Sequence, residues 1–274
     1  MAADTIEAVM RRDKLIVAAS LTTLAFVTWG YVLRLVGMMD MGGMAMPGMR
    51  MSSDPFEVAM FSSLQPWNMA ESIFAFIMWA VMMVGMMTPA AAPTILIYAR
   101  VRRQANLDNA PLAATGYFAG GYFLAWFAFS LVATMGQWLL ERYGLLDIAM
   151  RVTGHVVAGV VLIAAGVFQL SPVKDACLRQ CQSPFVFIQR HGGFNKGRAG
   201  SLKLGFDLGL YCVGCCWSLM ALLFVGGIMN IFWIAAIAVF VLAEKLMPKL
   251  GILSRLAGAA LFAAGIALII RPLF

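Results

Sequence analysis

Seven apolar runs, each about as long as a bilayer is thick, dominate this chain of 274 residues. A membrane-spanning helix needs about 20 apolar residues, because the hydrocarbon core is about 30 Å thick. With 62% hydrophobic and only 12% charged residues, the chain has too little charged surface for a soluble domain. We therefore predict an all-α, polytopic membrane helical bundle that forms a single transmembrane domain over residues 1–274. About seven transmembrane helices are expected, at residues 15–36, 68–99, 112–138, 148–170, 207–227, 229–246 and 252–270.

The distribution of basic residues predicts how these helices are oriented. Fifteen of the twenty Lys and Arg residues fall on one side of the predicted spans, six of them in a basic loop at residues 171–206. Cytoplasmic loops carry the excess of Lys and Arg in membrane proteins. We therefore expect a cytoplasmic N-terminus, a cytoplasmic loop at 171–206 and a C-terminus outside. The net charge of +7 follows from this asymmetry, so the expected partner is the lipid bilayer and no nucleic acid.

A methionine-rich loop follows the first predicted span, at residues 37–66 on the exterior side. Within it, residues 38–51 read MMDMGGMAMPGMRM. A short loop rich in glycine has no core to fill, but its thioether sulfurs are soft and neutral. Thioethers favour soft ions, above all Cu(I), and they bind without losing a proton. We predict that Cu(I) is captured there by Met38, Met39, Met41, Met44, Met46, Met49 and Met51.

The second predicted span continues the sulfur-rich pattern. Met78, Met82 and Met86 recur every four residues and so share one helical face, and Met83 and Met87 form an adjoining column. These thioethers form a candidate path for Cu(I) along the helix. Methionine also packs well into irregular gaps between helices, and both interpretations remain open at this point.

Two prolines follow the methionines in the same span. Pro89 and Pro93 each lack a backbone donor and free a carbonyl one turn earlier. Interrupted helices recur at the binding sites of membrane transporters, although prolines also kink helices merely for packing. We expect the helix to be interrupted here.

The fifth predicted span contains three clustered thiols. Cys212, Cys215 and Cys216 are related by i, i+3 and i+4, so they lie on one helical face, and Met220 extends that face by one turn. Three thiols on one face form a candidate Cu(I) site. The alternative is packing, because cysteine behaves as a small apolar residue in helices. A disulfide among them is not expected, because neighbouring helical positions rarely meet its geometry.

The remaining cysteines and the two histidines carry weaker signals. Cys177 and Cys181 lie in the basic loop with a C-x3-C spacing and no evident fourth ligand, which disfavours a structural zinc site. They form either a thiol pair that receives or senses a metal or ordinary loop cysteines. For His155 we favour a hydrogen bond between helices over a ligand role. No role is predicted for His191.

Four segments also resemble a known family. They are MWAVMMVGMMTPAAAP, CLRQCQSPFVF, YCVGCCWSLMALLFVGGIMNIFW and EKLMP. Together they resemble the predicted metal-binding integral membrane proteins, a bacterial family, over residues 65–250. The resemblance implies a multi-pass fold in the bacterial cytoplasmic (inner) membrane. It also implies metal ligands at Cys212, Cys215, Cys216 and in the segment 82–87. The exterior methionine loop lies outside the resemblance.

Three functions remain open. The leading hypothesis is Cu(I) acquisition at the exterior loop and passage through Met and Cys ligands toward the cytoplasm, since affinity rises from thioether to thiolate. The second is a copper delivery or assembly factor that serves a copper protein without translocation. The third is a structural subunit of a membrane complex. The chain has no H-x-x-H or Walker A motif, so we expect neither enzymatic activity nor ATP-driven transport.

Overall fold

The computed structural model describes residues 16–34, 37, 67, 69–104, 111–147, 150–193, 197–247 and 251–270. These residues fold into helices, and no strand occurs among them, which confirms the all-α prediction for this part of the chain. After a first helix at Ile16–Arg34, the order is α3 (Met69–Gln104), α4 (Pro111–Arg142), α5 (His155–Gln169), α6 (Pro172–Gln182), α7 (Pro184–Arg190), α8 (Arg198–Ala221), α9 (Leu223–Gly226), α10 (Ile231–Leu246) and α11 (Gly251–Ile270). The exterior methionine loop lies outside the described residues.

Among the described residues, five helices are long and apolar enough to cross a membrane: Ile16–Arg34, Met69–Arg102, Ala113–Arg142, Arg198–Gly226 and Gly251–Ile270. A sixth span is possible if α5 and α6, which meet at an angle of 62°, are counted together. At 1.5 Å per residue, the 16 residues of α10 extend only about 24 Å. The structure thus supports a helical membrane protein. The count of seven spans and the orientation of the termini remain predictions.

The fourth predicted span differs most from the structure. It was expected over residues 148–170, but α5 begins only at His155, after a segment in which Leu146 and Val152 form an isolated β-bridge. Gly154 precedes the helix with φ 108°, a backbone conformation that favours glycine. His155 is exposed at the start of α5, whereas the predicted span at 148–170 placed it inside a transmembrane helix.

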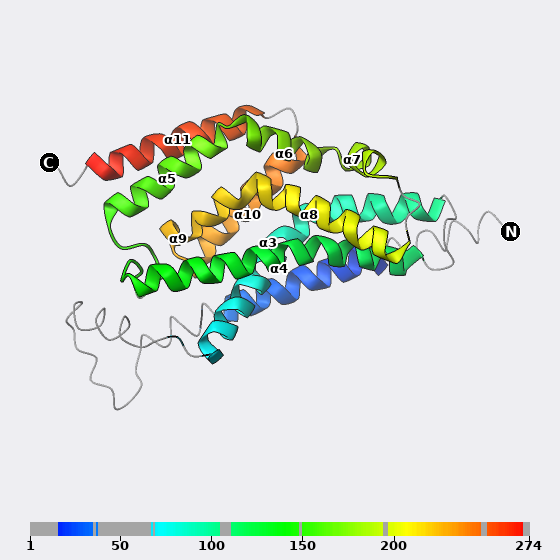
Figure 1. Cartoon of the computed structure of the whole chain (residues 1–274), viewed down its shortest axis with the longest axis horizontal. Helices are drawn as coiled ribbons and strands as arrows, with labels where there is room; N and C mark the ends of the chain where they lie inside the picture. Colours follow the sequence, from blue (N-terminus) through cyan, green and yellow to red (C-terminus); the bar gives the residue numbers. More distant parts are fainter. Residues whose placement is uncertain are drawn as a thin grey trace.

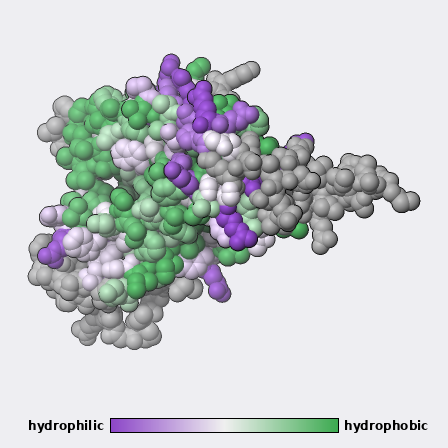
Figure 2. Space-filling model, turned by 45° about the vertical axis from the view of Figure 1, so that its right-hand side comes forward, coloured by the Kyte–Doolittle hydropathy of each residue, from purple (hydrophilic) through white to green (hydrophobic). Residues whose placement is uncertain are grey.

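Apolar side chains cover much of the molecular surface. Figure 2 shows them over a large part of one face, with hydrophilic side chains gathered in patches. Large exposed side chains include Val132 and Met135 of α4 and Phe232 of α10. Soluble monomers rarely expose contiguous apolar surface on this scale. This surface is therefore suited to contact with lipid.

Two closely packed helix pairs organise the described residues, α4 with α8 and α5 with α11 (Figure 1). Glycines permit the close approach of α4 and α8. A Cβ atom at Gly121 would collide with the carbonyl oxygen of Leu202, and one at Gly205 would collide with that of Phe118. Small residues of this kind let membrane helices approach each other through their backbones. The α4–α8 contact holds the cysteine-bearing helix in place.

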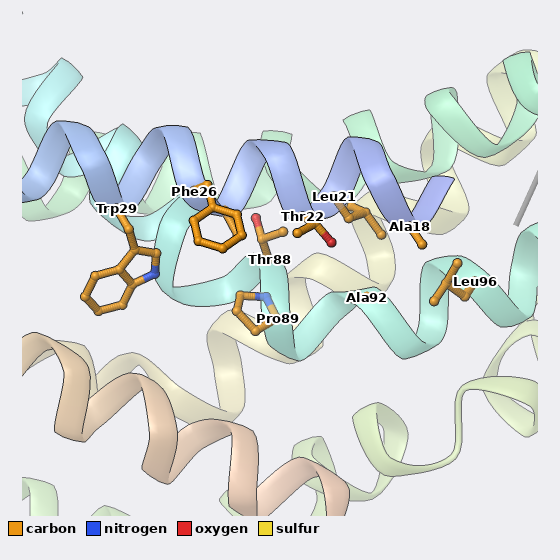
Figure 3. A pocket seen from close by; sticks show the side chains of 10 residues that line it. Ala18, Leu21, Thr22, Phe26, Trp29, Thr88, Pro89, Ala92 and Leu96 are labelled. Carbon is orange, nitrogen blue, oxygen red and sulfur yellow. The ribbon is translucent and has the colours of Figure 1, made fainter. Parts of the chain in front are cut away.

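The long helix α3 runs through both prolines without interruption. It spans 36 residues and includes Pro89 and Pro93, so the predicted break does not occur. Beside Pro89, an apolar pocket of about 450 Å³ separates α3 from the first helix (Figure 3). Its lining includes Phe26, Trp29 and Leu96 but no thiol or carboxylate. The pocket lacks the residues needed to bind a metal ion.

Candidate metal centre

Cys212 of α8 is the centre of a buried cluster of polar side chains. Its side chain is fully buried, with an exposed fraction of 0%. The hydroxyl of Tyr122, from α4, lies 3.0 Å from its sulfur. The Nζ atom of Lys245, at the end of α10, lies 2.9 Å from the same sulfur. Three helices thus place polar groups around one cysteine in an otherwise apolar core.

Cys215 and Cys216 lie on the same face of α8 as Cys212, as the helical spacing predicts, and both are buried. Their thiols, however, donate to the carbonyl oxygen of Cys212. The distances are 3.0 Å for Cys215 Sγ and 2.9 Å for Cys216 Sγ. Such bonds to a carbonyl one turn earlier satisfy a polar side chain within its own helix. A metal ion would have to compete with these bonds for the two thiols.

A fourth thiol, which the sequence analysis did not assign to the site, joins the cluster from α6. The Cys181 thiol faces those of Cys212 and Cys215 and interacts with both. Cys181 and Cys212 also share a small cavity of about 10 Å³, which Lys245 borders. That volume is close to the lower limit for one water molecule. The i, i+4 spacing of Cys177 and Cys181 predicts that the two share one helical face. It does not predict that this face packs against α8.

The position of α6 depends on the residue next to Lys245. Glu244 is buried, and one of its carboxylate oxygens accepts from Lys174 of α6 at 2.5 Å. The same oxygen accepts from Gln169 at 2.7 Å and from Ser254 at 2.6 Å. The backbone carbonyl of Glu244 also accepts from Gln182, next to Cys181, at 2.7 Å. Adjacent residues of α10 therefore hold α6 and contact the thiol cluster.

Replacing Glu244 with glutamine should destabilise the protein by about 3–5 kcal/mol, because Lys174 would keep a buried charge without its partner. Lys174 has an exposed fraction of 0%. Thermal unfolding in detergent, followed by circular dichroism, would measure the change. Arg151→Gln is the matched control, since it removes an exposed pair with Asp147 that we expect to contribute less than about 1 kcal/mol. Equal effects of the two substitutions would contradict this assignment.

The predicted methionine ligands in the described part of the chain are all buried. Met78, Met82, Met83, Met86 and Met87 of α3 are at most 3% exposed and belong to the core. Their burial is equally compatible with packing. As metal ligands they therefore remain a prediction.

These methionines lead toward the thiol cluster along α3. Ala90 and Ala91 line the small cavity beside Cys212. They follow Met86 and Met87 by four residues, which is a rise of about 6 Å. Met220, one turn beyond Cys216 on α8, is also buried. The α3 methionines from 78 to 87, here called the methionine strip, thus end within about one helical turn of the cavity.

The described residues contain no group of three or more His, Cys, Asp or Glu side chains placed to hold a metal ion. Two of the α8 thiols are instead turned toward the backbone carbonyl of Cys212. His191 is occupied elsewhere, since its Nδ1 lies 2.9 Å from the carbonyl oxygen of Phe187 and its ring stacks on that residue. A three-sulfur site at Cys212, Cys215 and Cys216 therefore remains a prediction that requires side-chain rotation.

Lys245 gives the cluster its electrostatic character. Its side chain is buried, and no carboxylate in the described part of the chain pairs with it. Glu244 points its carboxylate to Lys174 instead. A buried ammonium group without an anionic partner is costly. Cys212, as a thiolate, is a candidate for that partner, and thiolate is also the form in which cysteine binds metals.

Comparison with known proteins identifies one family. A family model described as PpoB2, copper chaperone, matches residues 76–268, more than two thirds of the chain. The matched range contains all five cysteines, Lys245 and the five methionines of α3 between residues 78 and 87, and it excludes the loop at 37–66. No curated protein and no solved structure matches the chain.

Proposed function

This chain belongs to the PpoB2 copper chaperone family, and from that premise we propose that it binds Cu(I) among buried thiols and hands the ion to a partner. The proposed ligands are Cys181, Cys212, Cys215 and Cys216. Copper is the cargo of this site, and Cu(I) is the oxidation state that thiolates and thioethers favour. The proposal accounts for a cluster of sulfurs in a helical core that packing alone does not require.

The contact between Lys245 and Cys212 is the observation that carries this proposal. A Cu(I) ion that binds two of these four sulfurs as thiolates, while the other two remain neutral thiols, has one net negative charge, which the ammonium group of Lys245 balances. Zn(II) held by four thiolates would have two negative charges and would leave one unbalanced. Because unbalanced charge in a low-dielectric core is costly, the cluster is suited to Cu(I) rather than Zn(II).

We further propose that Cu(I) reaches the cluster from the exterior methionine loop. The methionine strip of α3 ends about one turn from the cavity beside Cys212. Thioethers at the loop and along α3, followed by thiols at the cluster, would give an affinity that rises toward the cytoplasm. The second candidate function is delivery from the loop to an exterior copper protein without translocation. The description of the family as copper chaperones favours transfer of copper to another protein, and it fits an acceptor on either side of the membrane.

Metal content of the purified protein tests this proposal. The protein in detergent would be loaded anaerobically with Cu(I) or with Zn(II), desalted, and measured by mass spectrometry. We expect near-stoichiometric copper in the wild type and little zinc. A variant lacking residues 38–51 should still retain copper at the thiols but acquire it more slowly from a weak donor. Copper that is absent from the wild type, or lost entirely with the loop, would refute the thiol cluster as the site.

A further inference from the structure

We propose that Cys177 is an exchange thiol, through which Cu(I) leaves the buried cluster for a thiol-bearing acceptor protein. This inference rests on the proposed function and adds the route of release. The three α8 cysteines are at most 2% exposed, and Cys181, although partly exposed as a residue, turns its thiol toward Cys212 and Cys215. An acceptor therefore cannot touch a metal ion that these four thiols hold. Transfer between thiols proceeds by attack of an incoming thiolate, which needs access. An accessible thiol next to the cluster is therefore required.

Cys177 meets that requirement by its place on α6. It is partly exposed and lies one turn before Cys181, on the same face of the helix. Its sulfur is close enough to Cys215 for the two thiols to interact electrostatically. Cys177 thus lies beside the cluster and is partly exposed.

Gly214 makes this approach possible. It lies between Cys212 and Cys215 on α8, and a Cβ atom at this position would be 3.3 Å from the Cys177 sulfur. That distance is tighter than most real contacts of a Cβ atom, so a larger side chain would push the thiol of Cys177 away from α8. Gly214 thus faces Cys177 and leaves room for its thiol.

The polarity of α6 places this thiol near water. The helix has three charged residues among eleven, Lys174, Asp175 and Arg179. Lys174 is turned inward to Glu244, whereas Arg179 is exposed. A segment with this composition is not expected in the hydrocarbon core. The sequence predicts this loop in the cytoplasm, which is where the acceptor would then be found.

The transfer is a ligand exchange that conserves charge and electrons. The thiolate of Cys177 forms a bond to Cu(I) as one bond to a cluster thiolate, from Cys215 or Cys181, breaks. A first acceptor thiolate then displaces Cys177, and a second acceptor thiolate displaces the last cluster thiolate, so that the ion leaves bound to the acceptor alone. The proton released by each incoming thiol passes to the thiolate that leaves. Copper remains Cu(I) throughout, so no oxidant or reductant is needed.

The test separates binding from release. Copper-loaded full-length protein in detergent would be mixed with a synthetic Cys-x-x-Cys peptide under anaerobic conditions, and the copper that reaches the peptide would be followed in time. Cys177→Ser should slow transfer about tenfold or more, since the ion would lose a positioned acceptor. Its equilibrium Cu(I) affinity, measured against a competing chelator, should stay within about twofold of the wild type. Ala176→Ser, an exposed neighbour on α6, should leave both quantities unchanged.

A second variant keeps Cys177 but alters its approach. Gly214→Val should slow transfer in the same way, because the added side chain displaces the Cys177 thiol from α8. Unchanged transfer in Cys177→Ser would overturn the exchange role, and so would a large loss of equilibrium affinity, which would make Cys177 a primary ligand. A wild type that binds no Cu(I) would instead overturn the proposed function. Cu(I) binding by the wild type is therefore measured before any transfer experiment.

Discussion

Replacing Cys212 with serine should lower Cu(I) affinity about 100-fold or more, the largest effect that we expect from any single substitution. Cys212 is the sulfur on which the Tyr122 hydroxyl and the Lys245 ammonium group converge, at 3.0 and 2.9 Å. A serine hydroxyl is a hard ligand that does not ionise at neutral pH, so it cannot replace a thiolate on a soft ion. Losses of 10- to 100-fold already follow when the groups that only support metal ligands are removed.

The effect should differ among the α8 thiols. Cys216→Ser should weaken binding less than Cys212→Ser, because the Cys216 thiol is bonded to a backbone carbonyl and has no charged partner in the described structure. Ser218→Ala is the matched control. Ser218 is buried on the same helix, and its hydroxyl has no hydrogen-bond partner among the described residues. Competition with a Cu(I) chelator would measure all three variants. A Cys212→Ser protein with wild-type affinity would exclude the cluster as the copper site.

Replacing Lys245 with methionine should change affinity and stability in opposite directions. Opposite unit charges about 4 Å apart attract by about 4 kcal/mol at an effective dielectric constant of 20. Part of this attraction should be recovered by rearrangement, so we expect a loss of Cu(I) affinity of about 10- to 100-fold. In the metal-free protein, a buried ammonium group gives way to an apolar side chain of similar length. The Cys212 thiol can then stay protonated, so no unpaired charge remains buried, and the metal-free protein should be as stable as the wild type or more stable.

Two measurements check the prediction for Lys245. A chelator competition gives the Cu(I) affinity, and thermal unfolding of the metal-free protein in detergent gives the stability. Lys203→Met, an exposed lysine on α8, should alter neither. Lys245→Arg should retain part of the affinity because it keeps the positive charge. If Lys245→Met bound Cu(I) as tightly as the wild type, charge balance by this residue would be ruled out.

The helical character of this protein follows from its sequence with little ambiguity. Apolar runs long enough to span a bilayer leave few alternatives, since backbone groups in lipid must bond within their own segment. The common face of Cys212, Cys215 and Cys216 was predictable for the same reason, because it depends only on helical spacing. Both inferences use interactions between residues close together in the chain.

The errors occur where local signals were weak or ambiguous. The prolines at 89 and 93 were expected to interrupt α3, yet the helix continues through both. The predicted span at 148–170 combined an irregular segment with the helix that starts at His155. The predicted span at 229–246 is shorter in the structure, at 16 residues. Hydropathy is averaged over a stretch of about 20 residues, so it does not show where within that stretch the backbone turns.

The sequence by itself determined the helices, the sulfur-rich faces and the affinity of those sulfurs for a soft ion. Only the tertiary structure decided which groups meet. Lys245 reaches Cys212 across 33 residues, and Cys181 reaches it because Glu244 holds α6 in place. Glycines at the α4–α8 contact bring Tyr122 to the same sulfur. Helical spacing relates residues within a turn or two, whereas these contacts depend on how separate helices pack, which no local pattern encodes.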